Sequence, residues 1–262
     1  MPDRLIAETP FVRRARRTNR RIRLFCFPHA GAGASAFAAW PDLLPPEVEV
    51  VAVQLPGRED RVGEPHPASV DVAVRMVAVA LRPYLQGPYA FFGHSGGALL
   101  AFELARALRK RGTQPGHLFL SGQSAPGHDI AAPELHRLSD DDLRAAVRSM
   151  DGTSDGVFTD PELMKLLLPT LRADFTLWEN HRHRPDQPLS VPVTALGGDT
   201  DPRAPVSGLR AWEEQTTGAF SVEVFPGGHF YLHDAEAELA GLIGGALLGR
   251  EPAYTGQGGR NS

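Results

Sequence analysis

Cysteine and long hydrophobic runs are scarce in this sequence. Cys26 is the one cysteine among 262 residues, so no disulfide can form within the chain, and we expect a protein of the cytoplasm. No window holds about 18 uninterrupted apolar residues, which argues against a membrane-spanning helix, and the N-terminus lacks the apolar stretch of a secretory signal. Histidine, cysteine and acidic residues do not recur at the spacing of metal ligands, so we expect no metal site.

The charge is unevenly distributed along the chain. The formal net charge is −4, yet the first 23 residues hold eight arginines against Asp3 and Glu8, so the remainder is acidic. An acidic body argues against binding to nucleic acid. We expect residues 1–20 to form a flexible basic arm in solvent or, as the alternative, a docking segment for an acidic protein partner. Residues 251–262, rich in glycine and polar side chains, are expected to be a disordered tail.

Apolar residues make up 42% of the chain, which is enough for a substantial core, and they follow two alternating patterns. Short, nearly continuous apolar runs predict buried strands over residues 22–27, 48–53, 89–93, 117–121, 191–197 and 221–225. Helical spacing of apolar residues over 70–85, 98–111 and 235–248 predicts amphipathic helices. This alternation predicts an α/β fold with a mostly parallel, doubly wound sheet.

One long stretch interrupts the alternation. Roughly 70 residues separate the predicted strands that end at 121 and begin at 191, and they contain no strand pattern. Ser139 can cap one helix, and Asp160 can begin a second. A third helical stretch has Leu171, Phe175 and Trp178 on one face, and Pro169 should split the last two stretches or begin the third. A helical insertion after a strand end is typical of a lid over an active site, and the alternative is a structural excursion without a gating role.

A serine lies at a sharp turn between a predicted strand and a predicted helix. Residues 93–97 read G-x-S-x-G and join the apolar run at 89–93 to the helix at 98–111. At such a turn the serine side chain projects from strained backbone, and the flanking glycines are needed because larger side chains would collide. The helix also directs the free N–H groups of its first turn toward the reacting centre. We therefore predict Ser95 as a catalytic nucleophile.

The candidate base and its orienting carboxylate follow two later strands. A serine hydroxyl needs a base and the base needs a carboxylate, in the chain order Ser, Asp, His for this fold class. His229 follows the predicted strand 221–225 through a glycine turn, and we predict it as the base. Asp201 and Asp199 both follow the strand 191–197. We favour Asp201 because it lies deeper in the loop, whereas Asp199 is placed to cap the turn.

Two backbone N–H donors are needed to bind the oxyanion of an acyl-transfer intermediate. Gly96, directly after the serine, supplies one. The other is expected from the loop of small residues after the first predicted strand, where Ala30 is our choice and Gly31 the close alternative. This loop lacks the glycine and lysine pattern of a phosphate-binding turn, so we expect no nucleotide or other cofactor.

Six motifs together resemble the type II thioesterases of polyketide and nonribosomal peptide pathways. They are the loop at 27–31 (FPHAG), the loop at 54–59 (QLPGRE), the serine turn at 93–97 (GHSGG), residues 171–175 (LRADF), the loop at 198–202 (GDTDP) and the loop at 226–230 (PGGHF). The resemblance covers residues 21–248. It implies an α/β-hydrolase domain over residues 21–250, with a helical lid at about 126–185.

The resemblance also implies a function. Enzymes of this family are discrete editing enzymes that hydrolyse aberrant or stalled acyl groups from the phosphopantetheine arm of carrier proteins. By position, Ser95, Asp201 and His229 match the family triad, and Gly96 and Ala30 match its oxyanion donors. The implied partners are acyl or peptidyl carrier protein domains. We expect no nucleic-acid or membrane partner, and we expect a monomer.

Other interpretations stay open at this point. The chain could instead be a general carboxylesterase or lipase acting on free esters, or an acyl-CoA thioesterase. A protein of another class, a non-catalytic carrier-protein binding module with a vestigial triad, is the remaining alternative. The role of Arg58 is open as well, because it could contact substrate or partner or stabilise its own tight loop.

Overall fold

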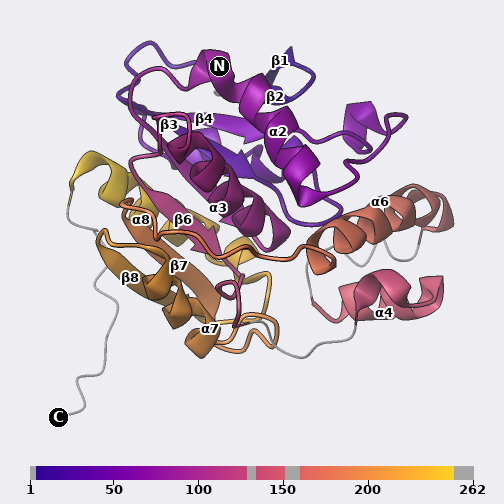
Figure 1. Ribbon diagram of the computed structural model, residues 1–262. Helices are drawn as coiled ribbons and strands as arrows, with labels where there is room; N and C mark the ends of the chain where they lie inside the picture. The colour runs from indigo at the N-terminus through magenta and orange to yellow at the C-terminus, as the bar shows by residue number, and fades with distance from the viewer. Residues whose placement is uncertain (1–3, 129–133, 151–159, 251–262) are drawn as a thin grey trace.

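A single sheet of eight strands organises the computed structural model, which describes residues 4–128, 134–150 and 160–250 (Figure 1). The strands lie in the order β1-β2-β4-β3-β5-β6-β7-β8. The pairs β1–β2 and β2–β4 are antiparallel, and every other neighbouring pair is parallel. The mostly parallel α/β sheet predicted from the sequence is therefore confirmed.

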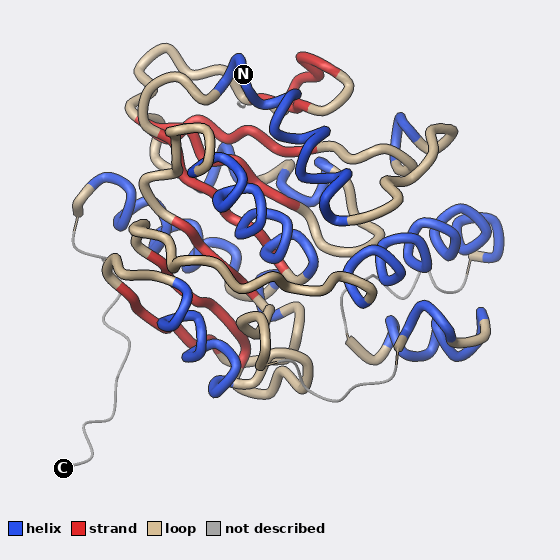
Figure 2. The backbone as a smooth tube through the Cα atoms, in the orientation of Figure 1, coloured by secondary structure: helices blue, strands red, loops and turns tan. Residues whose placement is uncertain are grey.

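Figure 2 shows the helices and strands along the backbone, and the bounds of the predicted strands lie within a few residues of those observed. The strands are β1 (Ile6–Thr9), β2 (Val12–Arg14), β3 (Ile22–Phe27), β4 (Val48–Val53), β5 (Tyr89–His94), β6 (Leu118–Ser121), β7 (Val193–Gly198) and β8 (Phe220–Phe225). The α-helices are α1 (Trp40–Leu43), α2 (Val70–Leu81), α3 (Gly96–Arg109), α4 (Asp140–Arg148), α6 (Pro161–Glu179), α7 (Val206–Arg210) and α8 (Glu236–Leu248). A 3-10 helix, η4 (Leu135–Arg137), precedes α4.

Helices cover both faces of the sheet because alternate strand residues point to opposite sides. On β3, Phe25 and Phe27 belong to the core beneath α2 and α3, whereas Leu24 and Cys26 belong to the core beneath α1 and α8. All of these β3 side chains are fully buried. The parallel strands thus end at one shared edge of the sheet, where their loops can meet, which is the usual location of a site in this class of fold.

The N-terminal segment is ordered over most of its length, so the prediction of a flexible arm over residues 1–20 is wrong. Strands β1 and β2 form a hairpin that extends the sheet beside β4. Val12 is fully buried, and two of the arginines form ion pairs: Arg13 with Asp60, and Arg16 with Glu8. Residues 1–3 and the predicted tail at 251–262 lie outside the described residues.

One buried carboxylate on β4 forms ion pairs with several arginines of this basic segment. Glu49 is fully buried and accepts hydrogen bonds from Arg23 Nε at 2.8 Å, from Arg20 at 3.2 Å and from the Arg17 backbone N–H at 3.2 Å. Arg14 pairs with the same carboxylate at 3.3 Å. Burial raises the pKa of Glu49, but the hydrogen bonds from Arg23 and Arg17 and the charge of Arg14 outweigh it and hold the pKa below the ordinary 4.5.

We expect Glu49→Gln to lower the free energy of unfolding by about 3 kcal/mol, because it leaves buried arginine without a counter-charge. Since the folded pKa of Glu49 is depressed, its contribution is complete above pH 4.5 and is lost as the pH falls through the folded value. Urea denaturation at pH 7 and at steps down to about pH 3 should show a smaller acid-dependent loss in the variant than in the wild type. Glu213→Gln, at an exposed site, is the matched control. An equal acid-dependent loss in wild type and Glu49→Gln would contradict this role.

The long insertion contains its own small hydrophobic core. Helices η4, α4 and α6 lie together at one end of the molecule (Figure 1) and pack through a shared buried cluster: Leu135, Leu143, Val147, Met164, Leu168, Leu171 and Phe175. Residues 129–133 and 151–159 of the predicted lid lie outside the described residues. No described helix combines the length and the apolar character needed to cross a bilayer.

Helix α6 runs without a break from Pro161 to Glu179, so the prediction that Pro169 splits it is wrong. An interior proline costs a helix about 3 kcal/mol. Burial of Leu168 and Leu171 on either side offsets that cost. The Thr170 hydroxyl, which donates to the Gly57 carbonyl oxygen at 2.9 Å, holds the same turn against the body of the protein.

Candidate active site

Ser95 occupies the sharp turn between β5 and α3, as the sequence motif predicts. Its backbone has φ 54° and ψ −125°, a conformation that costs a non-glycine residue free energy. A Cβ at Gly93 would collide with the backbone of Gly97, and one at Gly97 would collide with the Phe27 carbonyl group. The two glycines are therefore required by the close approach of β3, β5 and α3, and the turn projects the serine from the edge of the sheet.

His229 and Asp201 are paired at the same edge, from the loops after β8 and β7. His229 Nδ1–H donates to Asp201 Oδ2 at 2.8 Å, and both residues are buried. Because the carboxylate can only accept, this bond places the proton on Nδ1 and leaves Nε2 as the basic nitrogen. Burial raises the pKa of Asp201, but the hydrogen bond and charge of His229 outweigh it, so the pKa stays below its ordinary value and the carboxylate stays ionised.

Asp199 has a different role from Asp201. Its Oδ1 accepts a hydrogen bond from the Gly227 backbone N–H at 2.9 Å, and the residue is exposed. This contact stabilises the loop that carries His229, as expected for a turn-capping residue. The geometry thus favours Asp201 as the partner of the imidazole.

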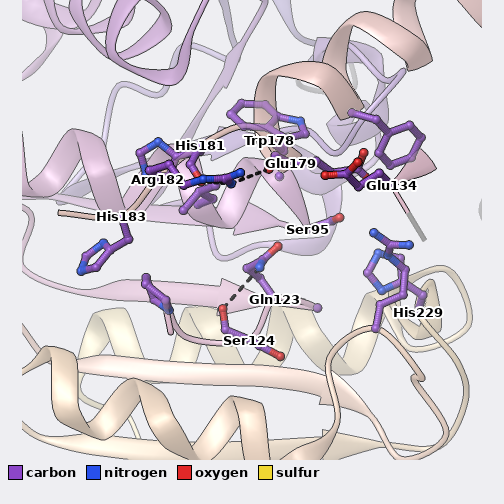
Figure 3. Close-up of a pocket in the computed structure, with 16 residues that line it drawn as sticks. Ser95, Gln123, Ser124, Glu134, Trp178, Glu179, His181, Arg182, His183 and His229 are labelled. Carbon is purple, nitrogen blue, oxygen red and sulfur yellow. Dashed lines mark hydrogen bonds between the residues drawn. The ribbon is translucent and has the colours of Figure 1, made fainter. Parts of the chain in front are cut away.

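Ser95 and His229 line two cavities that meet at the serine. The first, the polar cavity, has a volume of about 320 Å³ and is lined among others by Gln123, Trp178 and Arg182 (Figure 3). The second, the apolar cavity, has about 240 Å³ and lies against α4 and α6; its apolar lining includes Val147, Met150, Leu167, Leu171, Phe175 and Phe230. Among the described residues no hydrogen bond joins Ser95 Oγ to His229, and such bonds commonly tighten only when substrate is bound.

The backbone donors near Ser95 differ in their availability. The Gly31 N–H already donates to Asp174 Oδ2 at 2.8 Å. The Ala30 N–H has no acceptor in the part of the chain that the structure describes, and Gly96 begins α3, where an N–H has no partner within the helix. The Ala30 and Gly96 N–H groups are therefore available to bind an oxyanion, whereas the Gly31 N–H is occupied.

Arg58 forms a buried ion pair with Asp174 that links three segments. The guanidinium donates to both carboxylate oxygens of Asp174 at 2.7 Å and to the Ala32 carbonyl oxygen at 3.1 Å. Arg58 is 3% exposed and Asp174 is 1% exposed. Together with the bond from Gly31, the pair joins α6 to the loop after β3 and to the loop after β4. These contacts support a structural role for Arg58 rather than a role in contacting substrate or partner.

We expect Asp174→Ala to lower the free energy of unfolding by about 3–5 kcal/mol, because it strands the buried Arg58 cation and frees the Gly31 N–H. Guanidinium denaturation followed by circular dichroism measures this change. Asp141→Ala, which removes an exposed carboxylate from α4, should change stability by no more than about 1 kcal/mol. A loss at Asp174 as small as the one at Asp141 would show that the ion pair does not hold these segments together.

Two other histidines near Ser95 are not placed to act as the base. His94 is buried, its Nδ1 bonds Ser121 Oγ at 2.9 Å, and Ser121 in turn bonds the Tyr231 hydroxyl at 2.7 Å. Burial holds the pKa of His94 well below 6.5 and lowers that of His29 to about 3. The centres of the His94 and His229 rings lie 5.1 Å apart, so this network packs against the His229 imidazole. Sequence reasoning identified neither the network nor Arg203, which lines both cavities.

Within the described ranges, no three histidine, cysteine or acidic side chains are grouped in a way that could hold a metal ion.

Comparison with known proteins identifies the family. A family model described as the thioesterase domain matches residues 22–247. The gramicidin S biosynthesis protein GrsT of Aneurinibacillus migulanus is 44% identical over 220 residues, which cover 84% of this chain and 86% of that protein. The thioesterase PikA5 of Streptomyces venezuelae is 43% identical over 234 residues, covering 88% and 82%.

A solved structure supports the same assignment. The type II thioesterase BorB from the borrelidin biosynthetic cluster superposes with a TM-score of 0.86 at 38% identity, covering 92% of this chain and 99% of that one. These matches confirm the resemblance that the sequence motifs indicate. The chain therefore belongs to the thioesterase domain family: it is a thioesterase with the α/β-hydrolase fold and is similar to type II thioesterases.

Proposed function

We propose that this thioesterase hydrolyses acyl thioesters on the phosphopantetheine arm of carrier proteins, removing aberrant or stalled acyl groups during polyketide or nonribosomal peptide synthesis. The observation that carries the proposal is the meeting of a polar and an apolar cavity at Ser95, beside the His229–Asp201 pair. A substrate with a polar carrier arm and an apolar acyl group on the two sides of one thioester matches such a site. The relatives named above support the biosynthetic setting.

The geometry supports a two-step mechanism with a covalent intermediate. His229 Nε2 takes the Ser95 proton as Oγ attacks the thioester carbonyl, and Asp201 stabilises the imidazolium that forms. The Ala30 and Gly96 N–H groups bind the oxyanion. The carbon–sulfur bond then breaks, and the thiol leaves with the proton from His229. Water, activated by the same imidazole, cleaves the acyl-serine and releases the acid.

The insertion helices suggest how the acyl group is held. Phe175 and Leu171 of α6 and Val147 of α4 line the apolar cavity, so the acyl chain would lie between these helices and the sheet edge. The carrier arm would enter through the polar cavity, where Gln123 and His181 can bond its amide groups. We propose that η4, α4 and α6 act as the lid and that the enzyme works as a monomer with a carrier domain docked at the polar side.

The test is a hydrolysis panel in which one acyl group is presented on three carriers. We expect kcat/KM on the acyl-carrier protein to exceed that on the corresponding acyl-coenzyme A and aryl ester by at least about tenfold. A preference for coenzyme A or for the free ester would favour the acyl-CoA thioesterase or the carboxylesterase instead. Failure of a fluorophosphonate probe to label Ser95 would favour a non-catalytic binding module.

A further inference from the structure

A groove between α2, α3 and the end of α6, here called the outer groove, adjoins the polar cavity. It has a volume of about 440 Å³ and is lined by residues of these three helices and of the segment that follows α6. Among the described residues, His181 and Arg182 line both the polar cavity and the outer groove. Ser95 lines the polar cavity but not the outer groove. Arg182 therefore lies on the side of the polar cavity that faces the groove.

The segment after α6, residues 181–184, is held on α3 in a way that directs its two arginines outward. It has no helix or strand, and its histidines are half-buried whereas Arg182 and Arg184 are exposed. His181 Nε2 and His183 Nδ1 lie 3.3 and 3.2 Å from Oε1 of Glu103 on α3. The Arg184 carbonyl oxygen also accepts a hydrogen bond from α3, from the Arg106 guanidinium. The histidines thus fix the segment, and Arg182 is free to contact a ligand.

The guanidinium of Arg182 is anchored at one nitrogen only. Its Nη1 donates to the backbone carbonyl oxygens of Glu179 at 3.1 Å and of His181 at 3.4 Å, at the end of α6 (Figure 3). Within the described ranges it forms no ion pair, and Nε and Nη2 donate no hydrogen bond. Because Nη1 is already held, less side-chain freedom is lost when the remaining donors bind an anion.

The carboxylates that line the polar cavity and the outer groove do not offset the charge of Arg182. Glu103 holds the segment after α6, and Glu179 accepts the backbone N–H groups at the start of η4. Glu134 pairs with Arg137 at 2.7 Å. Asp71 lies in the first turn of α2, where the helix dipole favours a negative charge. Among the described residues, none of these carboxylates is within ion-pair distance of the Arg182 guanidinium.

We propose that Arg182 binds the phosphodiester of the carrier arm while the thioester lies at Ser95. This inference rests on the proposed function and names the residue that recognises the arm. The arm carries its sulfur at one end and its phosphate at the other. A substrate that fills the polar cavity from Ser95 outward therefore brings the phosphate to the side where Arg182 lies. The guanidinium suits this group because Nε and Nη2 can donate to two phosphate oxygens at once.

Two other arginines near the polar cavity differ from Arg182 in position. Arg203 lines the polar cavity, but it also lines the apolar cavity, so it lies near the thioester end of the substrate. Arg184 is exposed and lines the outer groove, but it does not line the polar cavity. Of the three arginines, Arg182 alone lines both the cavity that receives the arm and the groove outside it.

The experiment compares one apolar acyl group carried on phosphopantetheine and on pantetheine, two thioesters that differ only in the phosphate. At low ionic strength we expect the wild type to have a KM at least about fivefold lower for the phosphopantetheine thioester. Arg182→Gln should raise that KM to the value for the pantetheine thioester and leave kcat unchanged, because the contact is remote from the reacting carbonyl. Arg182→Lys should keep part of the preference.

Arg184→Gln is the matched control, because it removes the same charge two residues away and should leave the preference for the phosphorylated thioester as in the wild type. Equal KM values for the two thioesters in the wild type would overturn the inference. An equal rise in both KM values in Arg182→Gln would also overturn it, because the arginine would then shape the cavity rather than bind phosphate.

The remaining outcomes separate a different anion and the proposed function from this inference. If Arg182→Gln raised KM for the acyl-carrier protein but left the preference between the two small thioesters intact, the bound anion would be an acidic side chain of the carrier, and the inference would be wrong. Absence of any Ser95-dependent hydrolysis of acyl-carrier protein would instead refute the proposed function. Hydrolysis that continues without a phosphate preference would refute the inference alone.

Discussion

Ser95→Ala is expected to reduce kcat/KM for thioester hydrolysis by about 10⁴-fold or more, to the level of water attack assisted by the remaining binding groups. The substitution removes the attacking oxygen and the site of the acyl intermediate. The variant should also fail to react with a fluorophosphonate probe. Steady-state kinetics on an acyl-carrier protein and intact-protein mass spectrometry measure the two effects.

The folded structure should survive this change. The strain at Ser95 comes from a Cβ at φ 54°, and alanine keeps the same Cβ, so the free energy of unfolding should stay within about 1 kcal/mol of the wild type. Ser207→Ala, on the exposed side of α7, is the matched control and should keep full activity. Substantial hydrolysis by a folded Ser95→Ala protein would remove the serine mechanism altogether.

Asp201→Asn should lower kcat by about 10³–10⁴-fold with a much smaller change in KM. The amide keeps the size of the side chain but loses its charge, so it no longer fixes the Nδ1–H tautomer of His229 or stabilises the imidazolium. Stopped-flow measurement of acyl-serine formation should place the loss in the chemical step rather than in substrate binding.

Asp199→Asn is the matched control for this experiment, because Asp199 lies two residues away in the same loop. Its side chain accepts the Gly227 N–H, a bond that the asparagine carbonyl oxygen can also form. We expect its kcat to remain within about threefold of the wild type. A larger loss at Asp199 than at Asp201 would reassign the orienting carboxylate.

The features that could be predicted from the sequence are those encoded within short segments. The buried parallel strands read as continuous apolar runs, and β3 and β4 begin and end at the predicted residues. The position of Ser95 could be predicted because the turn requires residues without side chains at Gly93 and Gly97. The pairing of His229 with Asp201 followed from strand order, because parallel strands bring their carboxyl ends to one edge.

The features that were missed depend on contacts between distant segments. The basic N-terminus lacks a strong strand pattern, and its order depends on Glu49, a carboxylate on β4 that could not be identified as its partner from local sequence. Pro169 is tolerated because tertiary packing around α6 outweighs the local cost. Likewise, the bond between Asp174 and Gly31 decides which backbone donor stays free, and it joins residues 143 positions apart.

The helices of the insertion differ in how firmly they are attached to the body of the protein, and this bears on the proposed binding of acyl chains of different size. Asp174 and Thr170 hold α6 through buried hydrogen bonds, so moving that helix would also displace the loop that carries Ala30 and Gly31. Among the described residues, helix α4 is attached to α6 by apolar side chains and by an ion pair between Arg172 and the exposed carboxylate of Asp140. If the acyl group binds in the apolar cavity as proposed, we expect a longer chain to be accommodated by a shift of α4 alone, which would leave the geometry around Ser95 unchanged.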